Sequence, residues 1–343
     1  MVSMLKRSQM MKPVRRLLDQ CLNVQAGENL LVLTDTNHVH LGELFVLVGE
    51  EIGADVGLMV MRPRSRHGEE PPAPVAAAMK AADAIIAPTT FSVNHSNARA
   101  EASKAGARLI FMPDVCDEIF LDGSLDIDFL QQKEKIDAIA RVLDEGTEVQ
   151  VRSPRGSNLR MSIRGKRAVP QTGICHDPGT ISPPPCVEVA VAPDEDTLEG
   201  KMIVDGAIVP GGACRSPVEL TFERGTIVAI DGDEEAERFR QLLASYDDEN
   251  VRRAVEMGMG MNPNARIGRA SSLEDEAEFG TMHIGIGNGI TFGSSIRANG
   301  HCDLVMRDAV IEVDGQVILE DRELKLPVAT KDRQRQERRR VNE

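Results

Sequence analysis

The sequence predicts an N-terminal α/β domain with a doubly wound parallel sheet over residues 1–146, and a β-rich, antiparallel, barrel-like domain over residues 147–330. Two observations lead to this prediction. Before residue 147, short apolar runs alternate with helical segments, which is typical of a parallel sheet covered on both faces. After it, strand-like runs follow one another between Gly, Pro and Asp turns, which indicates antiparallel strands. The length of 343 residues also fits two domains.

In the first domain, apolar runs predict the buried strands, at 30–33, 56–61, 84–87 and 108–111. Helical spacing of apolar residues between these runs predicts helices at 40–52, 75–82 and 97–105. Two more helices are predicted to flank the sheet, one up to about residue 21 and one over 126–144. Strands that alternate with helices in this way favour parallel pairing, because each crossover helix returns the chain to the same end of the sheet.

In the second domain, strands are predicted at 148–151, 159–163, 187–191, 218–222 and 226–230. One helix interrupts them, over about 234–245. The tail 331–343 is nearly all charged or polar, so it is predicted to be disordered.

Composition excludes several classes of partner. The formal net charge is −14 and the pI is near 5.1, which argues against nucleic acid and anionic membrane surfaces as partners. No apolar run is long enough to cross a bilayer, and the first residues lack the apolar centre of a signal peptide. The six cysteines are scattered without a C-x-x-C pair, as expected in a reducing compartment. These features predict a soluble, cytoplasmic protein.

The tripeptide His301-Cys302-Asp303 is the most informative motif, because alternate side chains of a strand share one face. An ordinary ion pair would explain this motif alone. His283 and the acidic run 274–278 lie just upstream, and together they favour a metal site. Imidazole with carboxylate suits zinc, iron, cobalt or manganese better than calcium or magnesium. Glu256 strengthens this interpretation, because an isolated carboxylate between apolar neighbours needs a partner.

Two neighbouring segments are predicted to shape the site. The run Gly285-Ile286-Gly287-Asn288-Gly289 has no helix after it that could receive a pyrophosphate, so it predicts tight turns and close backbone approach rather than dinucleotide binding. His176 precedes a rigid Pro-rich loop, which is predicted to form one wall of the site. Glu188 lies in an alternating strand, where its carboxylate could equally face solvent.

Motifs in a common order carry a resemblance to a known family. They are Pro185-Cys186-Val187-Glu188, then Glu256-Met257-Gly258-Met259-Gly260, then Gly280-Thr281-Met282-His283, and finally His301-Cys302-Asp303-Leu304. In this order they resemble aminopeptidase T, a family of cytoplasmic metallo-aminopeptidases. The resemblance implies a homodimer and two divalent ions, zinc, cobalt or manganese, held by Glu188, Glu256, His283, His301 and Asp303. It further implies a small-molecule or short-peptide substrate, with Glu276 or Glu278 as the bridge or general base. His176, because of its position before the Pro-rich loop, is a further catalytic candidate.

The chain departs from that family in length and in one residue. It is shorter, the interval from His283 to His301 is compressed, and Asn288-Gly289-Ile290 stands where the family has a catalytic tyrosine. The segment Glu195-Asp196-Thr197-Leu198-Glu199-Gly200 and the H-x-D motif also resemble the 2,5-dihydroxypyridine 5,6-dioxygenases, whose length is closer. That resemblance implies one ferrous ion held by two histidines and a carboxylate.

Two functions therefore follow from the sequence, and the ligand pattern orders them. The dioxygenases carry histidine at the position of Glu256 and lack a counterpart of His283, so the ligand pattern here favours the hydrolase. The prediction is a metal-dependent hydrolase that cleaves an amide or peptide bond. The alternative is a ring-cleaving dioxygenase in which His283, His301 and Asp303 hold one Fe(II). A metal-free binding protein with a decayed site is a third class.

Overall fold

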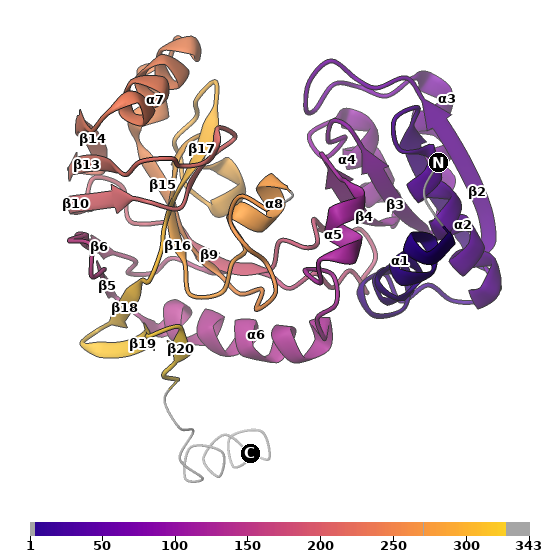
Figure 1. Ribbon diagram of the computed structural model, residues 1–343, viewed down its shortest axis with the longest axis horizontal. Helices are drawn as coiled ribbons and strands as arrows, with labels where there is room; N and C mark the ends of the chain where they lie inside the picture. The colour runs from indigo at the N-terminus through magenta and orange to yellow at the C-terminus, as the bar shows by residue number, and fades with distance from the viewer. Residues whose placement is uncertain (1–3, 270, 327–343) are drawn as a thin grey trace.

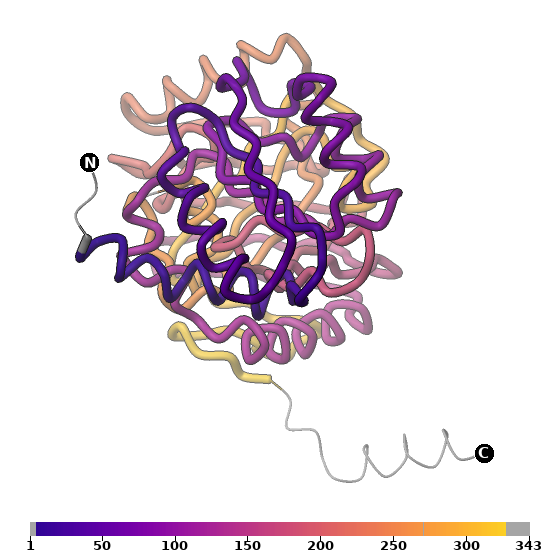
Figure 2. The backbone as a smooth tube through the Cα atoms, turned by 90° about the vertical axis from the view of Figure 1, so that its right-hand side faces the viewer, coloured from indigo at the N-terminus to yellow at the C-terminus, as the bar shows by residue number. Residues whose placement is uncertain are grey.

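The computed structural model describes residues 4–269 and 271–326, and the predicted disordered tail lies outside them. Figure 1 shows two lobes side by side, the α/β lobe in indigo to magenta and the β lobe mainly in orange and yellow. Helix α6 (Phe129–Glu145) runs beneath the β lobe and extends toward the α/β lobe. Figure 2, in which the α/β lobe faces the viewer, shows the same helix along the lower edge of the molecule.

The α/β lobe is built on a five-stranded sheet with the order β2-β1-β3-β4-β8, in which every pair is parallel. Its strands are β1 (Asn29–Asp35), β2 (Asp55–Met61), β3 (Ala84–Thr89), β4 (Arg108–Pro113) and β8 (Ile181–Ser182). The first four are the four strands that the apolar runs predict. Strand β8 is new, because its two residues belong to the Pro-rich region of the second half of the chain and pair with β4.

Helices cover both faces of this sheet, which confirms the doubly wound prediction. They are α1 (Met4–Arg16), the π-helical turn η1 (Leu17–Cys21), α2 (Val39–Ile52), α3 (Ala73–Ala81), α4 (Asn97–Ala105) and α5 (Asp117–Leu121). Alternate residues of β1 point to opposite faces: Leu30 packs in the core with α1 and α2, and Leu31 in the core with α3 and α4. Gly53 and Gly106 end α2 and α4 in the left-handed conformation that glycine adopts without strain.

Asp35 ties the carboxyl ends of β1 and β3 together. Its buried carboxylate accepts hydrogen bonds from the backbone N–H of Thr90 at 2.6 Å and of Asn37 at 3.0 Å, and lies 3.0 Å from Nδ1 of His38. Burial raises the pKa of Asp35, but these hydrogen bonds outweigh it and hold the pKa below its ordinary value of 3.8. The ionised carboxylate therefore stabilises the fold.

We expect Asp35→Asn to lower the free energy of unfolding at pH 7 by about 1–3 kcal/mol, because the hydrogen bonds lose their charged acceptor. A group whose pKa is lowered on folding contributes stability above its unfolded pKa and loses it as pH falls through the folded value. The difference between variant and wild type should therefore shrink below about pH 4. Urea unfolding at neutral and acid pH measures both effects. A difference that does not depend on pH would contradict this role of the carboxylate.

The first sheet of the β lobe has eight antiparallel strands in the order β14-β13-β10-β6-β5-β18-β19-β20. They are β5 (Glu148–Arg152), β6 (Asn158–Ser162), β10 (Glu199–Val204), β13 (Val218–Glu223), β14 (Thr226–Asp231), β18 (Val310–Val313), β19 (Gln316–Glu320) and β20 (Glu323–Leu324). Helix α7 (Glu234–Ser245) has the predicted bounds and packs on β13 and β14.

The second sheet of the β lobe has seven antiparallel strands in the order β12-β11-β17-β16-β15-β9-β7. They are β7 (Ala168–Gln171), β9 (Glu188–Val191), β11 (Ala207–Val209), β12 (Gly212–Ala213), β15 (Ala254–Gly260), β16 (Met282–Gly287) and β17 (His301–Met306). The barrel-like expectation is wrong for the part of the chain that the structure describes, because the antiparallel strands form two sheets and neither closes on itself. The predicted antiparallel, β-rich character is confirmed.

Helix α6 connects the two lobes and packs against β7 and β9 of the second sheet. The division of the chain at residue 147 and the homodimer stay predictions. None of the helices formed by residues 4–269 and 271–326 has both the length and the apolar character needed to cross a bilayer.

Candidate metal centre

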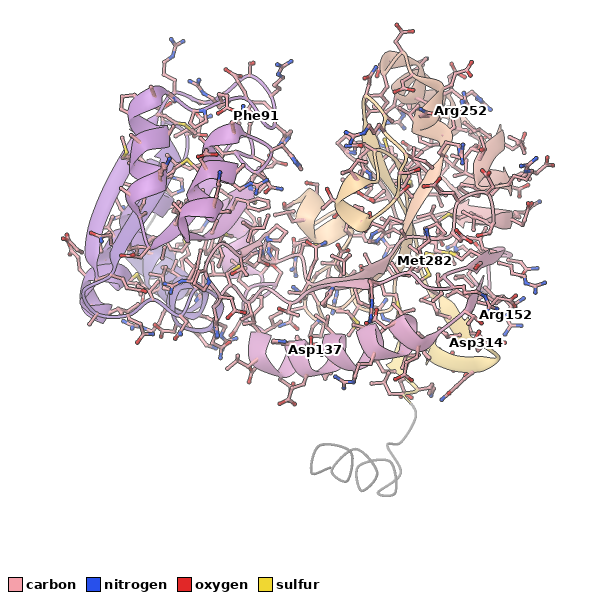
Figure 3. All side chains as sticks on the ribbon, turned by 180° about the vertical axis from the view of Figure 1, so that it is seen from behind. Phe91, Asp137, Arg152, Arg252, Met282 and Asp314 are labelled. Carbon is pink, nitrogen blue, oxygen red and sulfur yellow. The ribbon has the colours of Figure 1, made fainter. Side chains whose placement is uncertain are left out.

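Four adjacent strands of the seven-stranded sheet bring the predicted metal ligands together on one face. Glu188 comes from β9, Glu256 from β15, His283 from β16, and His301 and Asp303 from β17. Met282, labelled in Figure 3, directly precedes His283 and marks β16 within the β lobe. The structure agrees with the prediction that the H-x-D side chains share one face. His301 and Asp303 lie on one strand, with Cys302 between them.

A glycine faces each of these ligands across the sheet. The pairs are Glu188 with Gly260, Glu256 with Gly285, His283 with Gly258, His301 with Gly287, and Asp303 with Gly285. A cross-strand neighbour with a side chain would lie about 4.5–5.5 Å away and would fill the space over the sheet. The glycines therefore leave room above the strands for long polar side chains to converge.

At two of these glycines, an added side chain would collide with the ligands. A Cβ atom on Gly258 would lie 2.1 Å from Nε2 of His283. A Cβ atom on Gly285 would lie 2.8 Å from Oε2 of Glu256 and 3.0 Å from Cε1 of His301. Close backbone approach at the glycine run is thus confirmed, but the predicted tight turn is wrong for Gly285 and Gly287, which lie within β16.

Glu256 lies between the two imidazoles. Its Oε1 is 3.5 Å from Nε2 of His283, and its Oε2 is 3.4 Å from Nε2 of His301. Each imidazole has one further carboxylate beside it: Glu188 Oε2 is 3.5 Å from His283 Nε2, and Asp303 Oδ1 is 3.1 Å from His301 Nε2. Two groups of possible ligands result, and Glu256 belongs to both.

A third group adjoins the first. It consists of Cys186, Glu188 and Glu276, whose ligand atoms also lie within 4.8 Å of one another. Glu188 therefore belongs to two of the groups, and the three groups form one continuous cluster. Glu188, Glu256 and His283 are at most 2% exposed, whereas the side chain of His301 is 27% exposed. His301 thus lies at the open side of the cluster.

The cluster fits a divalent cation. Glu188 Oε2, Glu256 Oε2 and His283 Nδ1 are buried and have no hydrogen-bond partner. Buried polar atoms of native proteins nearly always have a partner, so unpaired carboxylate oxygens that converge on one space indicate a cation-binding site. Nitrogen and oxygen ligands together suit zinc, cobalt, manganese or ferrous iron.

Electrostatics lead to the same conclusion. Burial raises the pKa of Glu188 to about 8, although the charge of His283 opposes it, and burial with the nearby carboxylates raises the pKa of Glu276 well above its ordinary value. Burial lowers the pKa of His283, but Glu256, Glu188 and Asp303 outweigh it and raise the value to about 10. Protons therefore balance the carboxylates in the metal-free protein, and a cation would replace them.

The structure separates the two glutamates that the sequence left open. Glu276 joins the cluster through Cys186 and Glu188. Glu278 is also buried, but its Oε2 accepts a hydrogen bond from the N–H of Ile267 at 2.9 Å, and its Oε1 accepts one from Arg322 at 3.0 Å. Glu276 therefore belongs to the candidate centre, and Glu278 is held in an ion pair.

We expect Glu278→Gln to lower the free energy of unfolding by about 1–3 kcal/mol, because Arg322 and Arg307 lose a buried anionic partner. The effect stays moderate because both arginines are partly exposed to solvent. Its metal content should match that of the wild type. The matched variant Glu276→Gln should show the opposite pattern, with metal binding or turnover impaired and little change in stability. Elemental analysis and urea unfolding of both variants measure this, and metal loss confined to Glu278→Gln would reverse the assignment.

His176 and the tyrosine of the chain both lie away from the cluster. His176 is exposed, its Nε2 lies 2.7 Å from the backbone oxygen of Gln20, and it belongs to none of the three groups found among the described residues. The structure therefore does not bring His176 to the cluster, because its loop runs to the parallel sheet at β8. Tyr246, the one tyrosine, has its hydroxyl 3.5 Å from Sγ of Cys302. Cys302 faces away from the neighbouring ligands, so this phenol does not replace the tyrosine of aminopeptidase T.

Sequence reasoning missed three residues of the site. Cys186 belongs to the third group, and its position two residues before Glu188 is the signal that could have found it. Gln171, which pairs with Glu188 across β7 and β9, donates its side-chain N–H to that carboxylate. Phe292, in the short helix η3 (Ile290–Phe292), stacks on His301 with ring centroids 5.8 Å apart.

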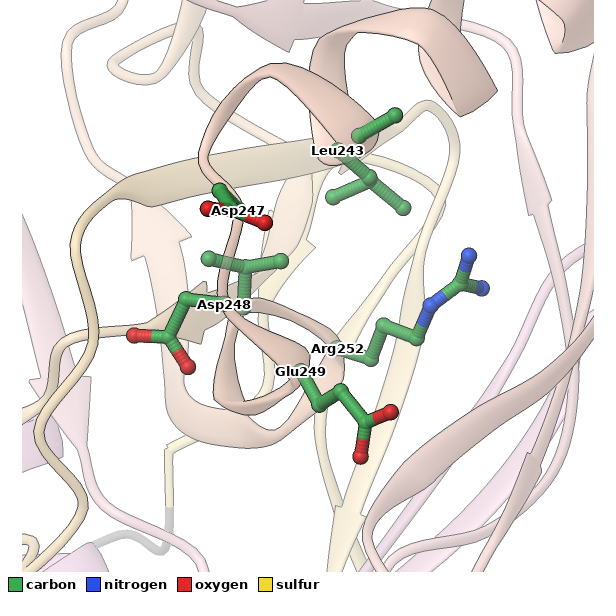
Figure 4. Close-up of a pocket in the computed structure, with 7 residues that line it drawn as sticks. Leu243, Asp247, Asp248, Glu249 and Arg252 are labelled. Atoms are coloured by element: carbon green, nitrogen blue, oxygen red, sulfur yellow. The ribbon is translucent and has the colours of Figure 1, made fainter.

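A separate hollow lies at the end of α7 and is shown in Figure 4. Its lining includes Leu243, Asp247, Asp248, Glu249 and Arg252, and it shares no residue with the metal cluster. It is open and shallow, and none of its lining residues lies in the seven-stranded sheet. The chemistry of the described residues therefore points to the cluster rather than to this hollow.

Comparisons with known proteins agree with the fold. The sequence model of the 2,5-dihydroxypyridine 5,6-dioxygenase family matches residues 9–325. The 2,5-dihydroxypyridine 5,6-dioxygenase of Pseudomonas putida KT2440 is 25% identical over 257 residues, which cover 71% of each chain.

Two solved structures share the architecture. The 2,5-dihydroxypyridine dioxygenase from Pseudomonas putida KT2440 has a TM-score of 0.79 at 21% identity, covering 95% of this chain and 99% of that one. Aminopeptidase T (AmpT) from Thermus thermophilus has a TM-score of 0.69 at 16% identity, covering 93% and 99%. At these identities each likeness shows the fold alone, and the fold is common to both enzymes.

Proposed function

The chain belongs to the 2,5-dihydroxypyridine 5,6-dioxygenase family, and we propose that within this family it is a two-metal hydrolase that cleaves an amide or peptide bond of a small substrate. The position of Glu256 carries the proposal, because its two oxygens face two different imidazoles at 3.5 and 3.4 Å. Each imidazole also has its own second carboxylate. A carboxylate shared in this way could serve as a ligand of two cations.

The ligands divide into two sets around that bridge. Glu188 and His283 would hold one cation, and His301 and Asp303 the other. Two divalent cations held by these residues would supply an acidified water and polarise a substrate carbonyl. Gln171 orients Glu188 through its side-chain N–H, which is the role that outer partners have in metal centres.

Glu276 is the residue best suited to move a proton. Its carboxylate lies beside Glu188, within 4.8 Å of that ligand, so it could exchange a proton with a water held at the centre. Glu276 would accept the proton of the attacking water and deliver it to the leaving amine. Substrate would approach on the side of His301, where the imidazole is partly exposed and Phe292 stacks against it.

Ring-cleaving dioxygenation is the second candidate, and the family match and the 25% identical relative favour it. In this function His283, His301 and Asp303 would hold a single ferrous ion. Such a site needs both imidazoles around one ion, yet no group found among the described residues contains both His283 and His301. The geometry therefore supports the hydrolase better.

The two functions are distinguished by assaying one preparation in two metal states. Protein purified without chelators or a His tag is loaded with zinc, cobalt or manganese, or anaerobically with ferrous iron. We expect release of amine from amino-acid amides or short peptides in the first state, and no oxygen uptake with 2,5-dihydroxypyridine in the second. His301→Ala, in which a cluster ligand is removed, should abolish the hydrolysis. Oxygen consumption with ferrous iron, without any hydrolysis, would overturn the proposal in favour of the dioxygenase.

A further inference from the structure

The thiol of Cys186 faces the metal centre from the segment that leads into β9. Its Sγ lies 4.0 Å from Oε2 of Glu276, and both atoms lie within 4.8 Å of a Glu188 oxygen. Cys186 is 1% exposed. Cys186 follows the turn at Pro183, whose carbonyl accepts its backbone N–H at 3.0 Å, and lies two residues before Glu188, the first residue of β9.

An independent observation marks this place as a ligand position. Oε2 of Glu188 is buried and has no hydrogen-bond partner, and Glu188 is itself 2% exposed. Around tetrahedral zinc, ligand atoms at 2.0–2.3 Å from the metal lie roughly 3.5 Å from one another. The Sγ of Cys186 and an oxygen of Glu188 lie within 4.8 Å of each other, so a modest side-chain movement would bring them to the spacing that a shared cation requires.

We propose that Cys186 is a further ligand of the metal centre, with its thiolate joining Glu188 on the cation that Glu188 and His283 would hold, and giving the centre a preference for zinc over manganese. This proposal rests on the proposed function, because it requires a cation at Glu188. As the sulfur–metal bond forms, the thiol releases its proton to solvent, and no oxidant or reductant is needed. Thiolate is a soft ligand that suits zinc, whereas manganese prefers oxygen.

The surroundings of Cys186 explain why the cation is needed. Burial raises the pKa of the Cys186 thiol, and Glu188 and Glu276 raise it further. Without a cation the thiol donates a hydrogen bond to Oε2 of Glu276 and packs beside Ala265 and Ala277. A purely structural role predicts that this arrangement persists when metal binds.

Cys302 is a matched control in the same centre. It is also 1% exposed and lies between the ligands His301 and Asp303, but alternation turns it to the other face, where its Sγ meets the Tyr246 hydroxyl. Cys302 is adjacent in sequence to two ligands, whereas Cys186 is two residues from Glu188 and far in sequence from the other ligands. Only Cys186 should nevertheless bind metal.

Zinc K-edge absorption spectroscopy of the zinc-loaded full chain tests the proposal. We expect one sulfur at about 2.3 Å from zinc in the wild type and in Cys302→Ser, and a shell of only nitrogen and oxygen in Cys186→Ser. Zinc affinity relative to manganese should fall by at least about tenfold in Cys186→Ser, and the cobalt-loaded wild type should show a sulfur-to-cobalt charge-transfer band that this variant lacks.

Failure of this proposal can be told from failure of the proposed function. Bound zinc with no sulfur neighbour in the wild type would overturn the role of Cys186 and leave the two-metal centre intact. Absence of bound zinc in the wild type would overturn both. Because the wild-type spectrum decides the first point, the test holds even if Cys186→Ser does not fold.

Discussion

Glu256→Ala should reduce the metal content to less than one equivalent per chain and abolish turnover. Glu256 is the shared member of two ligand groups, with one oxygen beside His283 and the other beside His301, so its removal weakens both cation positions at once. Loss of an outer partner alone typically weakens metal binding by about 10–100-fold, and loss of a shared direct ligand should exceed that range. Elemental analysis and an amide-hydrolysis assay measure the two effects.

The control for this variant is Glu278→Gln, which alters a buried glutamate outside the cluster and should keep its metal. The fold of Glu256→Ala is checked by its urea-unfolding curve in the metal-free state. A variant that keeps a full equivalent of tightly bound metal would show that Glu256 does not serve both positions.

Gly258→Ala should also empty the site, although the substitution adds only one methyl group. The new Cβ would lie 2.1 Å from Nε2 of His283, so the imidazole must leave its position or the two strands must separate. Glycine is normally unfavourable inside a strand, and an alanine would usually stabilise it. Here we expect the reverse: loss of metal, together with a decrease of about 1–3 kcal/mol in the free energy of unfolding from overpacking.

Gly57→Ala is the matched control, because Gly57 also lies inside a strand, β2, and a Cβ there would meet no atom within 4 Å. Its metal content and stability should stay at or above wild-type values. If Gly258→Ala binds metal as tightly as Gly57→Ala, the space over β15 is not needed for the ligands to converge.

The parts of the fold that the sequence predicts well are those set by local pattern. Apolar runs located four strands of the parallel sheet, and helical periodicity located α7 at its observed bounds. The barrel-like expectation failed because closure depends on which strands pair at the edges, and the apolar pattern of a strand does not record its neighbours. Strand β8 was missed because two residues are too short to show any periodicity.

The candidate site, too, could be predicted from the sequence only where local pattern decides. Alternation along one strand predicts that His301 and Asp303 share a face, and the structure agrees. Glu276 and Glu278 could not be separated, because both belong to one acidic run and the distinction comes from Arg322, 44 residues beyond Glu278. The pairing of every predicted ligand with a glycine was equally hidden, since it depends on the register of β9, β15, β16 and β17.

The number of metal ions per chain tests the central claim most directly. Protein purified anaerobically, without chelators or a His tag, is analysed for metals against its concentration as a 37.4 kDa chain. A two-metal hydrolase predicts about two equivalents of zinc, cobalt or manganese, with Glu256 between them. A single equivalent of ferrous iron would contradict the account and support the dioxygenase.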